Sequence, residues 1–446
     1  MHDNKIIEYI QISKLHGYKN IKINFDSPYM ILLSENGQGK STILRIIKNC
    51  LNLELLSLQD IKFESIEIKF SQTNDIALLK KLDLDFEYSS RAYEYLSERL
   101  SKSDFNHILN LINSKKSYSS IISYTKNISS TTKINIPSMA IRELIEDRDK
   151  LLNNVGINNF REIIQKNFNK EILYLPTYRR IEQLMEEFEE SKIKDKNIQF
   201  GLRDVKVKIE EIRTNILSSS NNTMSRINSE ILKRLINGLE VNDEELKIIK
   251  ENKDHIDLLL NRFGNDLTEE DKIKIKNLIS SIDNLNDRSS QNTALFYFIS
   301  KMFNGFFEQR EKDQALKKFA EICSGYFINK TMKYNETSIN ISINSNDELS
   351  NLSEIQLEDL SSGEKQIVSL FSKLILDQEK EYFILFDEPE LSLSVEWQKK
   401  LLKDVLNSNS CHLLLCMTHS PFIYDELEEI TYDLSDFFLP TNMDEI

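Results

Sequence analysis

Ser34-Glu35-Asn36-Gly37-Gln38-Gly39-Lys40-Ser41-Thr42 is the segment on which the architecture of this 446-residue chain depends. It follows the apolar run YMILL at residues 29–33 and precedes ILRIIKNCL at residues 43–51, in which apolar side chains recur at helical spacing. The local order is therefore strand, glycine-bearing loop and helix. Backbone N–H groups of such a loop and of the first helical turn can hold phosphate, because they have no partner within the helix.

The residue types in this segment are those of a loop that binds nucleotide phosphates. In such a loop Lys40 reaches the β- and γ-phosphates, and the hydroxyl of Ser41 ligates Mg²⁺. The segment departs from the pattern GxxxxGK[ST] at its first position, where Ser34 stands in place of glycine. The alternative is a lysine-bearing helix cap on an unrelated loop, which the flanking strand and helix disfavour. We therefore expect ATP and Mg²⁺ to be bound by Asn36, Gly37, Gln38, Gly39, Lys40, Ser41 and Thr42.

The composition is that of a folded, acidic protein. Hydrophobic residues make up 40% of the chain and charged residues 29%, which argues against wholesale disorder. With 71 acidic and 57 basic side chains the net charge is -14, which disfavours indiscriminate binding of nucleic acid but leaves a local basic groove open. The length exceeds that of a usual single core, so we expect two or more units or one core with a large excursion.

We expect a cytoplasmic protein that does not bind membranes. The start MHDNKIIEYIQISKL lacks the basic and then apolar order of a signal peptide, and no run approaches the roughly 18 apolar residues of a spanning helix. The four cysteines follow no metal-ligand spacing. We therefore expect buried, reduced thiols at Cys50, Cys323, Cys411 and Cys416.

The pattern of elements predicts an α/β fold in which helices interrupt a mixed-sheet core. Period-two alternation predicts strands at residues 66–70 and 82–88, whereas long helical periodicity predicts helices or a short coiled coil elsewhere. We divide the chain into an N-terminal lobe at 1–90, a helical insertion at 91–170, a core strand at 171–185, a helical or coiled-coil insertion at 186–334 and a C-terminal lobe at 335–446.

A second motif lies at residues 383–388, where the apolar run FILF delivers two adjacent carboxylates. Asp387 is expected to hold the metal ion, and Glu388 to face the attacking water as general base. Taken alone, a buried strand that ends in acids more often marks a solvated strand end. Its position after the phosphate loop favours the catalytic interpretation.

Two further motifs follow the pattern of anion-binding sites. Ser361 and Gly363 in the segment LSSGE begin an apolar helix, whose free N–H groups attract negative charge, although Ser361 or Ser362 would also serve as an ordinary N-cap with Glu364. His419 lies at the end of a buried strand, where it would hydrogen-bond a γ-phosphate. A lone histidine in a turn is otherwise usually structural.

The order of the four motifs resembles the ATP-binding-cassette superfamily. There a phosphate loop, an LSGGQ-type signature, Walker B carboxylates and a switch histidine occur in this sequence. Here Ser361 matches the family serine, while Ser362 and Glu364 replace a glycine and a glutamine. Lys40 and Asp387 lie 347 positions apart, much farther than in a transporter cassette. The long helical insertion instead resembles the Rad50/SMC/OLD branch, and a transporter cassette is the minor alternative.

Within that branch, residues 174–182, 360–373, 387–402 and 417–427 resemble the ATPase subunits of two bacterial anti-phage systems, PtuA of Septu and AriA of PARIS. The resemblance implies an ATPase with Lys40, Glu388 and His419 as catalytic residues. It also implies that two subunits sandwich ATP, with Ser361, Ser362 and Gly363 of one contacting the γ-phosphate held by the other. Leu391–Ser394 would then be the D-loop that crosses the interface.

The resemblance implies a slow ATPase that senses a trigger and controls a separate nuclease or toxic effector through ATP-dependent dimer closure. DNA or a phage component is a further candidate ligand. Two alternatives remain: a Rad50/SMC-like ATPase of DNA repair or chromosome maintenance, and an ATP-bound scaffold with little turnover. The Mg²⁺-sensing glutamine is left open between Gln72 and Gln183. The cluster Tyr178-Arg179-Arg180 either contacts nucleotide, DNA or a partner, or forms an ion-paired surface turn.

Overall fold

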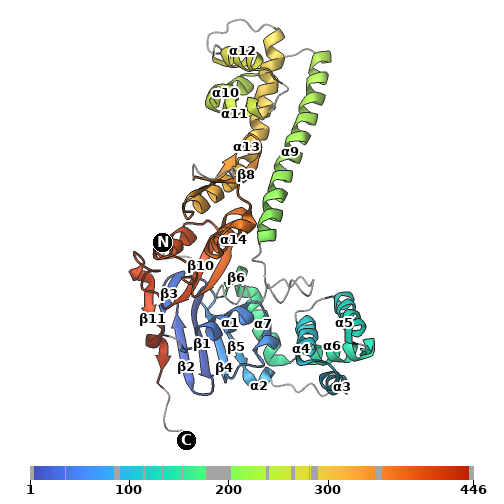
Figure 1. Cartoon of the computed structure of the whole chain (residues 1–446), viewed down its shortest axis with the longest axis vertical. Coiled ribbons are helices and arrows are strands. Elements are labelled where there is room, and N and C mark those ends of the chain that lie inside the picture. The colour runs from blue at the N-terminus through green and yellow to red at the C-terminus, as the bar shows by residue number, and fades with distance from the viewer. Residues whose placement is uncertain are drawn as a thin grey trace. The chain divides into compact units, whose positions relative to one another are not determined.

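The computed structural model places the chain in two compact units, which are described separately. The first comprises residues 1–180, 380–403 and 411–446, and the second comprises residues 181–379 and 404–410. The structure describes residues 5–35, 37–84, 91–113, 117–132, 134–152, 154–176, 202–237, 241–262, 267–280, 282, 290–346 and 354–440. Figure 1 shows the elements of both units.

An antiparallel sheet forms one layer of the first unit. Its strands lie in the order β12-β2-β1-β4-β5. In β1 the buried residues Ile10 and Ile12 alternate with partly exposed polar ones, as expected of a sheet with one face on a core. The strand bounds are β1 Ile7–Leu15, β2 Lys19–Asn24, β4 Ser65–Phe70, β5 Ile76–Lys80 and β12 Phe438–Leu439.

A second sheet of the first unit is parallel throughout, with strands in the order β11-β3-β10-β9-β6. All six residues of β9 are buried, which is typical of a parallel strand covered on both faces. The strand bounds are β3 Tyr29–Leu33, β6 Glu171–Leu175, β9 Tyr382–Asp387, β10 Cys411–Thr418 and β11 Thr431–Asp433. The predicted α/β fold is confirmed. Within this unit, its antiparallel strands lie in the first sheet and its parallel strands in the second.

Helices α1 (Lys40–Leu51) and α7 (Val155–Asn167) bury their apolar faces in the core of the first unit. Each large apolar side chain that is buried there contributes roughly 1.5–3 kcal/mol. Phe383 of β9 meets Phe25 and Phe168 edge to face, with ring centroids 6.5 and 6.3 Å apart. Phe383 is the second residue of β9, so this packing secures the amino-terminal end of the strand.

One predicted strand is wrong. Residues Lys81–Leu84 form the short helix α2, and the strand β5 lies before them. The strand ends because the carboxylate of Asp83 turns back and accepts a hydrogen bond from the Lys80 N–H at 3.2 Å. Residues 85–88, the remainder of the predicted strand, lie outside the described residues.

A set of four helices in the first unit has a hydrophobic core of its own. That core is formed by side chains such as Leu96, Ile108, Ile141 and Leu144. The helices are α3 (Arg91–Arg99), α4 (Lys102–Asn113), α5 (Tyr118–Thr132) and α6 (Ser138–Leu152). Among the smaller elements of this unit are the 3₁₀ turns η1 (Leu55–Leu58), η5 (Glu428–Ile430) and η6 (Leu434–Phe437), and α15 (Val395–Leu406) extends from it.

Two long helices dominate the second unit. Helices α9 (Leu202–Asn237) and α13 (Ser290–Ser324) contain 36 and 35 residues and pack against one another (Figure 1). At 1.5 Å per residue each is about 50 Å long. The unit also contains α10 (Asp243–Glu251), η2 (Lys253–His255), α11 (Ile256–Asn261), α12 (Glu269–Ser280), β7 (Lys330–Asn335), β8 (Asn340–Ser345), η4 (Leu357–Asp359) and α14 (Ser362–Leu376).

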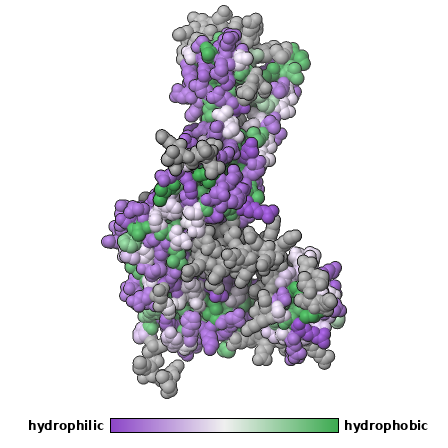
Figure 2. All heavy atoms as spheres, in the orientation of Figure 1, coloured by the Kyte–Doolittle hydropathy of each residue, from purple (hydrophilic) through white to green (hydrophobic). Residues whose placement is uncertain are grey.

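The cysteines are buried and reduced, as the sequence analysis expected. All four cysteines are free and buried, and burial raises the pKa of the Cys411 thiol to about 12. Hydrophilic side chains cover much of the described face that Figure 2 shows, with hydrophobic ones scattered among them. No helix within the described residues is long and apolar enough to cross a membrane.

Candidate nucleotide-binding site

The phosphate loop joins β3 to α1, as the sequence predicted. Gly37 and Gly39 have φ angles of 84° and 99°, in the left-handed region that favours glycine. Gly39 is the N-cap residue of α1, and within the described residues no side chain caps this helix end. The first N–H groups of α1 are thus available to a bound anion. Asn36 lies outside the described residues.

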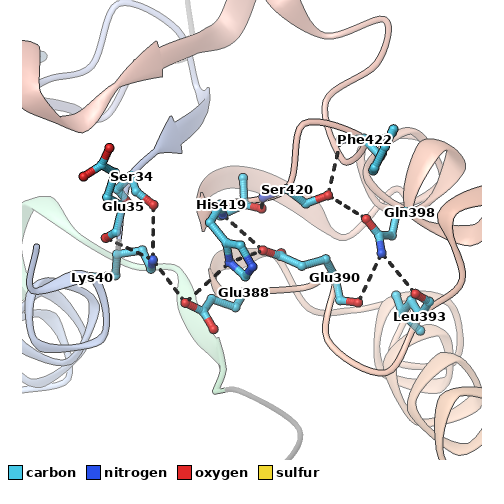
Figure 3. Close-up of polar contacts among 11 residues, drawn as sticks. Ser34, Glu35, Lys40, Glu388, Glu390, Leu393, Gln398, His419, Ser420 and Phe422 are labelled. Atoms are coloured by element: carbon cyan, nitrogen blue, oxygen red, sulfur yellow. Dashed lines mark hydrogen bonds and ion pairs between the residues drawn. The ribbon is translucent and has the colours of Figure 1, made fainter. Parts of the chain in front are cut away.

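Lys40 is buried at the start of α1, with 6% of its side chain exposed. Its Nζ donates to the carbonyl oxygens of Ser34 and Glu35 at 3.2 and 3.3 Å. The same ammonium group pairs with Oε1 of Glu388 at 3.1 Å (Figure 3). These contacts hold the lysine charge at the loop, beside the general base that the sequence predicted.

Strand register brings the second motif to the phosphate loop. Strand β10 lies between β3 and β9, so that Met417 is level with Leu32 on one side and with Asp387 on the other. The carboxyl ends of these parallel strands therefore share one sheet edge, where ligands of α/β proteins commonly bind. The backbone N–H of Glu388 donates to the Met417 carbonyl at 2.8 Å across this edge.

Glu388 has a strained backbone. Its φ of 50° is unusual for a residue with a side chain, and such conformations cost of order 1–3 kcal/mol. The bond to Met417 and the ion pair with Lys40 hold it there. Asp387, the preceding residue, is buried at the end of β9.

His419 lies beside Glu388 at the same edge. Its Nδ1 is 3.8 Å from Oε1 of Glu388 and 2.9 Å from Oε1 of Glu390. The structure thus brings Lys40, Glu388 and His419 into one continuous row (Figure 3). Sequence reasoning missed Glu390. The signal for it was a third acid placed three positions after Asp387.

The signature segment belongs to the second unit, where Ser361 forms the N-cap of α14. Its hydroxyl donates to Oε2 of Glu364 at 2.9 Å, and the same oxygen accepts from the Ser361 backbone N–H at 2.8 Å. The structure therefore contains the capping box that the sequence offered as the ordinary interpretation. Ser362 and Gly363 form the first turn of α14.

Glu364 is also bound by Lys330 of strand β7, whose Nζ lies 2.9 and 2.8 Å from its two carboxylate oxygens. Burial by itself raises the pKa of this carboxyl group. The hydrogen bonds from Lys330 and Ser361 lower it further than burial raises it, so the pKa of Glu364 lies below its ordinary value. Glu364 is therefore an anion at neutral pH.

The residues expected to bind Mg²⁺ suit that ion. Magnesium typically takes one or two protein oxygens and completes its octahedron with water and substrate phosphates. Ser41 in the first turn of α1 and the buried carboxylate of Asp387 at the end of β9 offer oxygen ligands of this kind. Within the described part of the chain, no group of three or more His, Cys, Asp and Glu side chains is arranged to hold a metal ion.

Gln72 lies away from this row. With Lys166 and His412 it lines a pocket of about 310 Å³. His412 is near the start of β10, whereas His419 follows the end of that eight-residue strand, so Gln72 is at the opposite edge of the sheet. Gln183 and the cluster Tyr178, Arg179 and Arg180 lie outside the described residues.

A parallel sheet with a phosphate loop at its carboxyl edge defines a nucleotide-binding α/β protein. The sequence model of the AAA ATPase domain family matches residues 6–424, and the chain belongs to this family. The match supports ATPase activity and nucleotide binding as properties of the family.

Solved structures also match the chain. One is the Smc head domain with an extended coiled coil, bound to the C-terminal domain of ScpA, from Pyrococcus furiosus. It is 14% identical with a TM-score of 0.36, over 94% of this chain and 90% of that one. None of the curated proteins compared matches the chain.

Proposed function

We propose that the chain binds ATP with Mg²⁺ at the loop of residues 34–42 and hydrolyses it with Lys40, Glu388 and His419. The observation that carries this proposal is the row of these three side chains, joined by contacts of 3.1 and 3.8 Å at the carboxyl edge of the parallel sheet. A cation, a carboxylate and an imidazole in this order provide phosphate binding, a general base and a contact for the transferred phosphate.

Before ATP binds, Lys40 and Glu388 form an ion pair, which is the resting state of the proposed reaction. When ATP enters, its β- and γ-phosphates compete with Glu388 for the ammonium group of Lys40. Glu388 is then released and can accept a proton from the water that attacks the γ-phosphate. Ser41 and Asp387 would hold Mg²⁺, which would neutralise phosphate charge. ATP binding thus changes the partners of Lys40 and Glu388, two side chains that already lie in the site.

The proposed dimer closure depends on the signature segment. Ser361, Ser362 and Gly363 of one subunit contact the γ-phosphate held by the second subunit, at the positive end of the α14 dipole. In the structure, however, the Ser361 hydroxyl already donates to Glu364. It has to leave Glu364 before it can donate to phosphate. This requirement provides a physical reason for the slow turnover that we propose.

At the level of the cell, the proposed role is that of a cytoplasmic sensor subunit of a bacterial anti-phage complex. Closure of the ATP-bound dimer would control a separate nuclease or toxic effector. The support for this role is the resemblance of residues 174–182, 360–373, 387–402 and 417–427 to such subunits. The net charge of -14 favours a protein over bulk nucleic acid as the controlled partner.

Two other functions are favoured by specific observations. The packed helices α9 and α13, of 36 and 35 residues, favour an SMC-like ATPase of DNA repair or chromosome maintenance. If ATP does not displace Glu388 from Lys40, the same ion pair keeps the general base occupied, which favours an ATP-bound scaffold with little turnover. DNA-stimulated turnover would identify the first alternative, and full biological function in Glu388→Gln would identify the second.

Nucleotide binding is tested by Lys40→Ala. We expect this change to abolish ATP binding in equilibrium dialysis, because it removes the only cation that the described residues place within 3.3 Å of the loop carbonyls of both Ser34 and Glu35. Lys48→Ala, in the last turn of the same helix α1, is the control and should bind ATP like the unmodified chain. Equal ATP affinity in Lys40→Ala and Lys48→Ala would contradict the assignment of this loop.

The defence role is tested by co-purification. The chain should bring down a nuclease or another effector encoded beside it, and ATP should change how much is recovered. Recovery of the chain alone from the native host, with and without ATP, would count against a controlled effector. This result would leave the ATPase assignment intact.

A further inference from the structure

We propose that Glu390 is a positioning residue of the ATPase site: its carboxylate holds the imidazole of His419 so that Nε2 faces the γ-phosphate. This inference rests on the proposed function, since it assigns a second residue to the contact made by His419. Glu390 lies in the turn after β9, two positions beyond Glu388. Figure 3 shows it on the side of the histidine away from Lys40.

One carboxylate oxygen makes both contacts to the histidine. Oε1 of Glu390 accepts from the backbone N–H of His419 at 3.1 Å and lies 2.9 Å from its Nδ1. The first bond fixes the position of the loop and the second fixes the rotation of the ring. Since a carboxylate only accepts hydrogen bonds, Nδ1 has to carry the proton in this contact. Nε2, the other ring nitrogen, is left for a ligand.

Because Glu390 is buried, its carboxylate needs the contact with His419 to offset the cost of burial. The residue is 6% exposed, and within the described residues its second oxygen, Oε2, is buried without a hydrogen-bond partner. A carboxylate buried with one oxygen unsatisfied is costly unless a charge or a strong donor compensates. His419 is the donor that the structure supplies. To donate to the γ-phosphate, Nε2 would have to carry a proton as well.

The ring of His419 is exposed to solvent, whereas the side chain of Glu390 is buried. Its side chain is 43% exposed, and no described residue hydrogen-bonds to Nε2. The arrangement follows the rule for metal-bound and catalytic histidines, in which a partner on one nitrogen orients the other nitrogen toward the chemistry.

Gln398 holds the turn that carries Glu390 against the loop that carries His419. Its Nε2 donates to the carbonyl oxygens of Leu393 and Glu390 at 3.0 and 3.5 Å. Its Oε1 accepts from the hydroxyl of Ser420 at 2.6 Å. Gln398 therefore joins the turn of Glu390 to the loop of His419 through hydrogen bonds.

A double-mutant cycle tests whether Glu390 acts through His419. We expect Glu390→Met to lower kcat for ATP hydrolysis by about 10-fold to 100-fold with KM changed less than about 2-fold. His419→Ala should cause a similar loss, and the double variant should be no slower than His419→Ala. Multiplied losses in the double variant, or wild-type kcat in Glu390→Met, would overturn the proposal.

Two further variants test whether a general loss of structure, and not a misplaced His419, lowers kcat. Glu390→Gln keeps an oxygen for both hydrogen bonds but loses the charge, so its kcat should lie between those of the wild type and Glu390→Met. Glu245→Gln removes a different buried carboxylate, in the capping box of α10, and should leave kcat unchanged. A kcat in Glu390→Gln below that of Glu390→Met would contradict the orienting role.

The ring itself provides a readout that needs no turnover. ¹⁵N NMR at about pH 9, where an ordinary imidazole is neutral, reports which nitrogen is protonated. His419, identified by the signal lost in His419→Ala, should carry its proton on Nδ1 in the wild type and shift toward Nε2 in Glu390→Met. An unchanged tautomer would overturn the proposal. If the wild type hydrolyses no ATP, the proposed function fails while this spectrum still tests the hold of Glu390 on His419.

Discussion

Gly39 has to adopt a backbone conformation that residues with side chains avoid. Its φ is 99°, while the nearest atom to a Cβ placed there, Nε2 of His16, is 3.7 Å away. Space is therefore available and only backbone strain opposes a side chain. The strain acts at the point where the loop becomes helix α1, so it should alter both stability and phosphate binding.

We expect Gly39→Ala to lower the free energy of unfolding by about 1–2 kcal/mol and to weaken ATP binding. Urea unfolding and equilibrium dialysis measure the two effects. Gly17→Ala is the matched control, because Gly17 has a φ of 93° and open space but lies in the β1–β2 turn. Equal ATP affinities in the two variants would show that Gly39 has no special place in the binding loop.

Glu364 provides the pH prediction. Its folded pKa lies below the ordinary value, so it stabilises the fold above the unfolded pKa of about 4.5, and this stabilisation is lost as pH falls through the folded pKa. Glu364→Gln should therefore be less stable than the wild type at pH 7, by about 0.5–2 kcal/mol. In thermal unfolding the difference between the two proteins should shrink as pH falls below the unfolded pKa and through the folded pKa of Glu364. A difference that persists or grows in acid would contradict the assignment.

At the scale of elements, helices α9 and α13 approach closely where Gly305 faces Thr223. A Cβ on Gly305 would lie 2.7 Å from Cγ2 of Thr223, which is too close. Thr223 is buried, so this methyl group has little room to move away. The overpacking cost of about 1–3 kcal/mol should exceed the gain of up to about 1 kcal/mol from replacing a helical glycine with alanine.

Gly305→Ala should thus destabilise the second unit, as measured by urea unfolding. In a Thr223→Ser background, which lacks the obstructing methyl group, the same change should become neutral or stabilising. A loss of equal size in both backgrounds would show that the contact with Thr223 is not the cause.

The elements that sequence reasoning predicted are those whose signals are local. Residues 34–42 carry their chemistry in one loop, and FILFDE at residues 383–388 is a buried strand with its acids at one end. Period-two alternation wrongly predicted a strand at residues 82–84, because the hydrogen bond from Lys80 to Asp83 ends the strand early. The sequence places Glu390 close to the two predicted acids, but its contact with His419 was not predictable, since His419 lies 29 positions later and meets it only after β10 is inserted.

At the scale of the whole molecule, the parallel sheet brings together motifs that are hundreds of residues apart. Strands β3, β9 and β10 each end at one edge, so that Lys40, Glu388 and His419 form a single row. The position of Gln72 at the other edge could be found only from this topology. The signature segment of the second unit would act in the proposed dimer, in which two chains would complete each ATP site.

The most direct measurement is ATP turnover in Glu388→Gln, with ATP binding and molecular mass followed in the same samples. We predict ATP binding at least as tight as in the wild type, turnover reduced by about 100-fold or more, and a dimer in light scattering only when ATP and Mg²⁺ are present. Undiminished turnover in Glu388→Gln would contradict the claim that this row of side chains hydrolyses ATP.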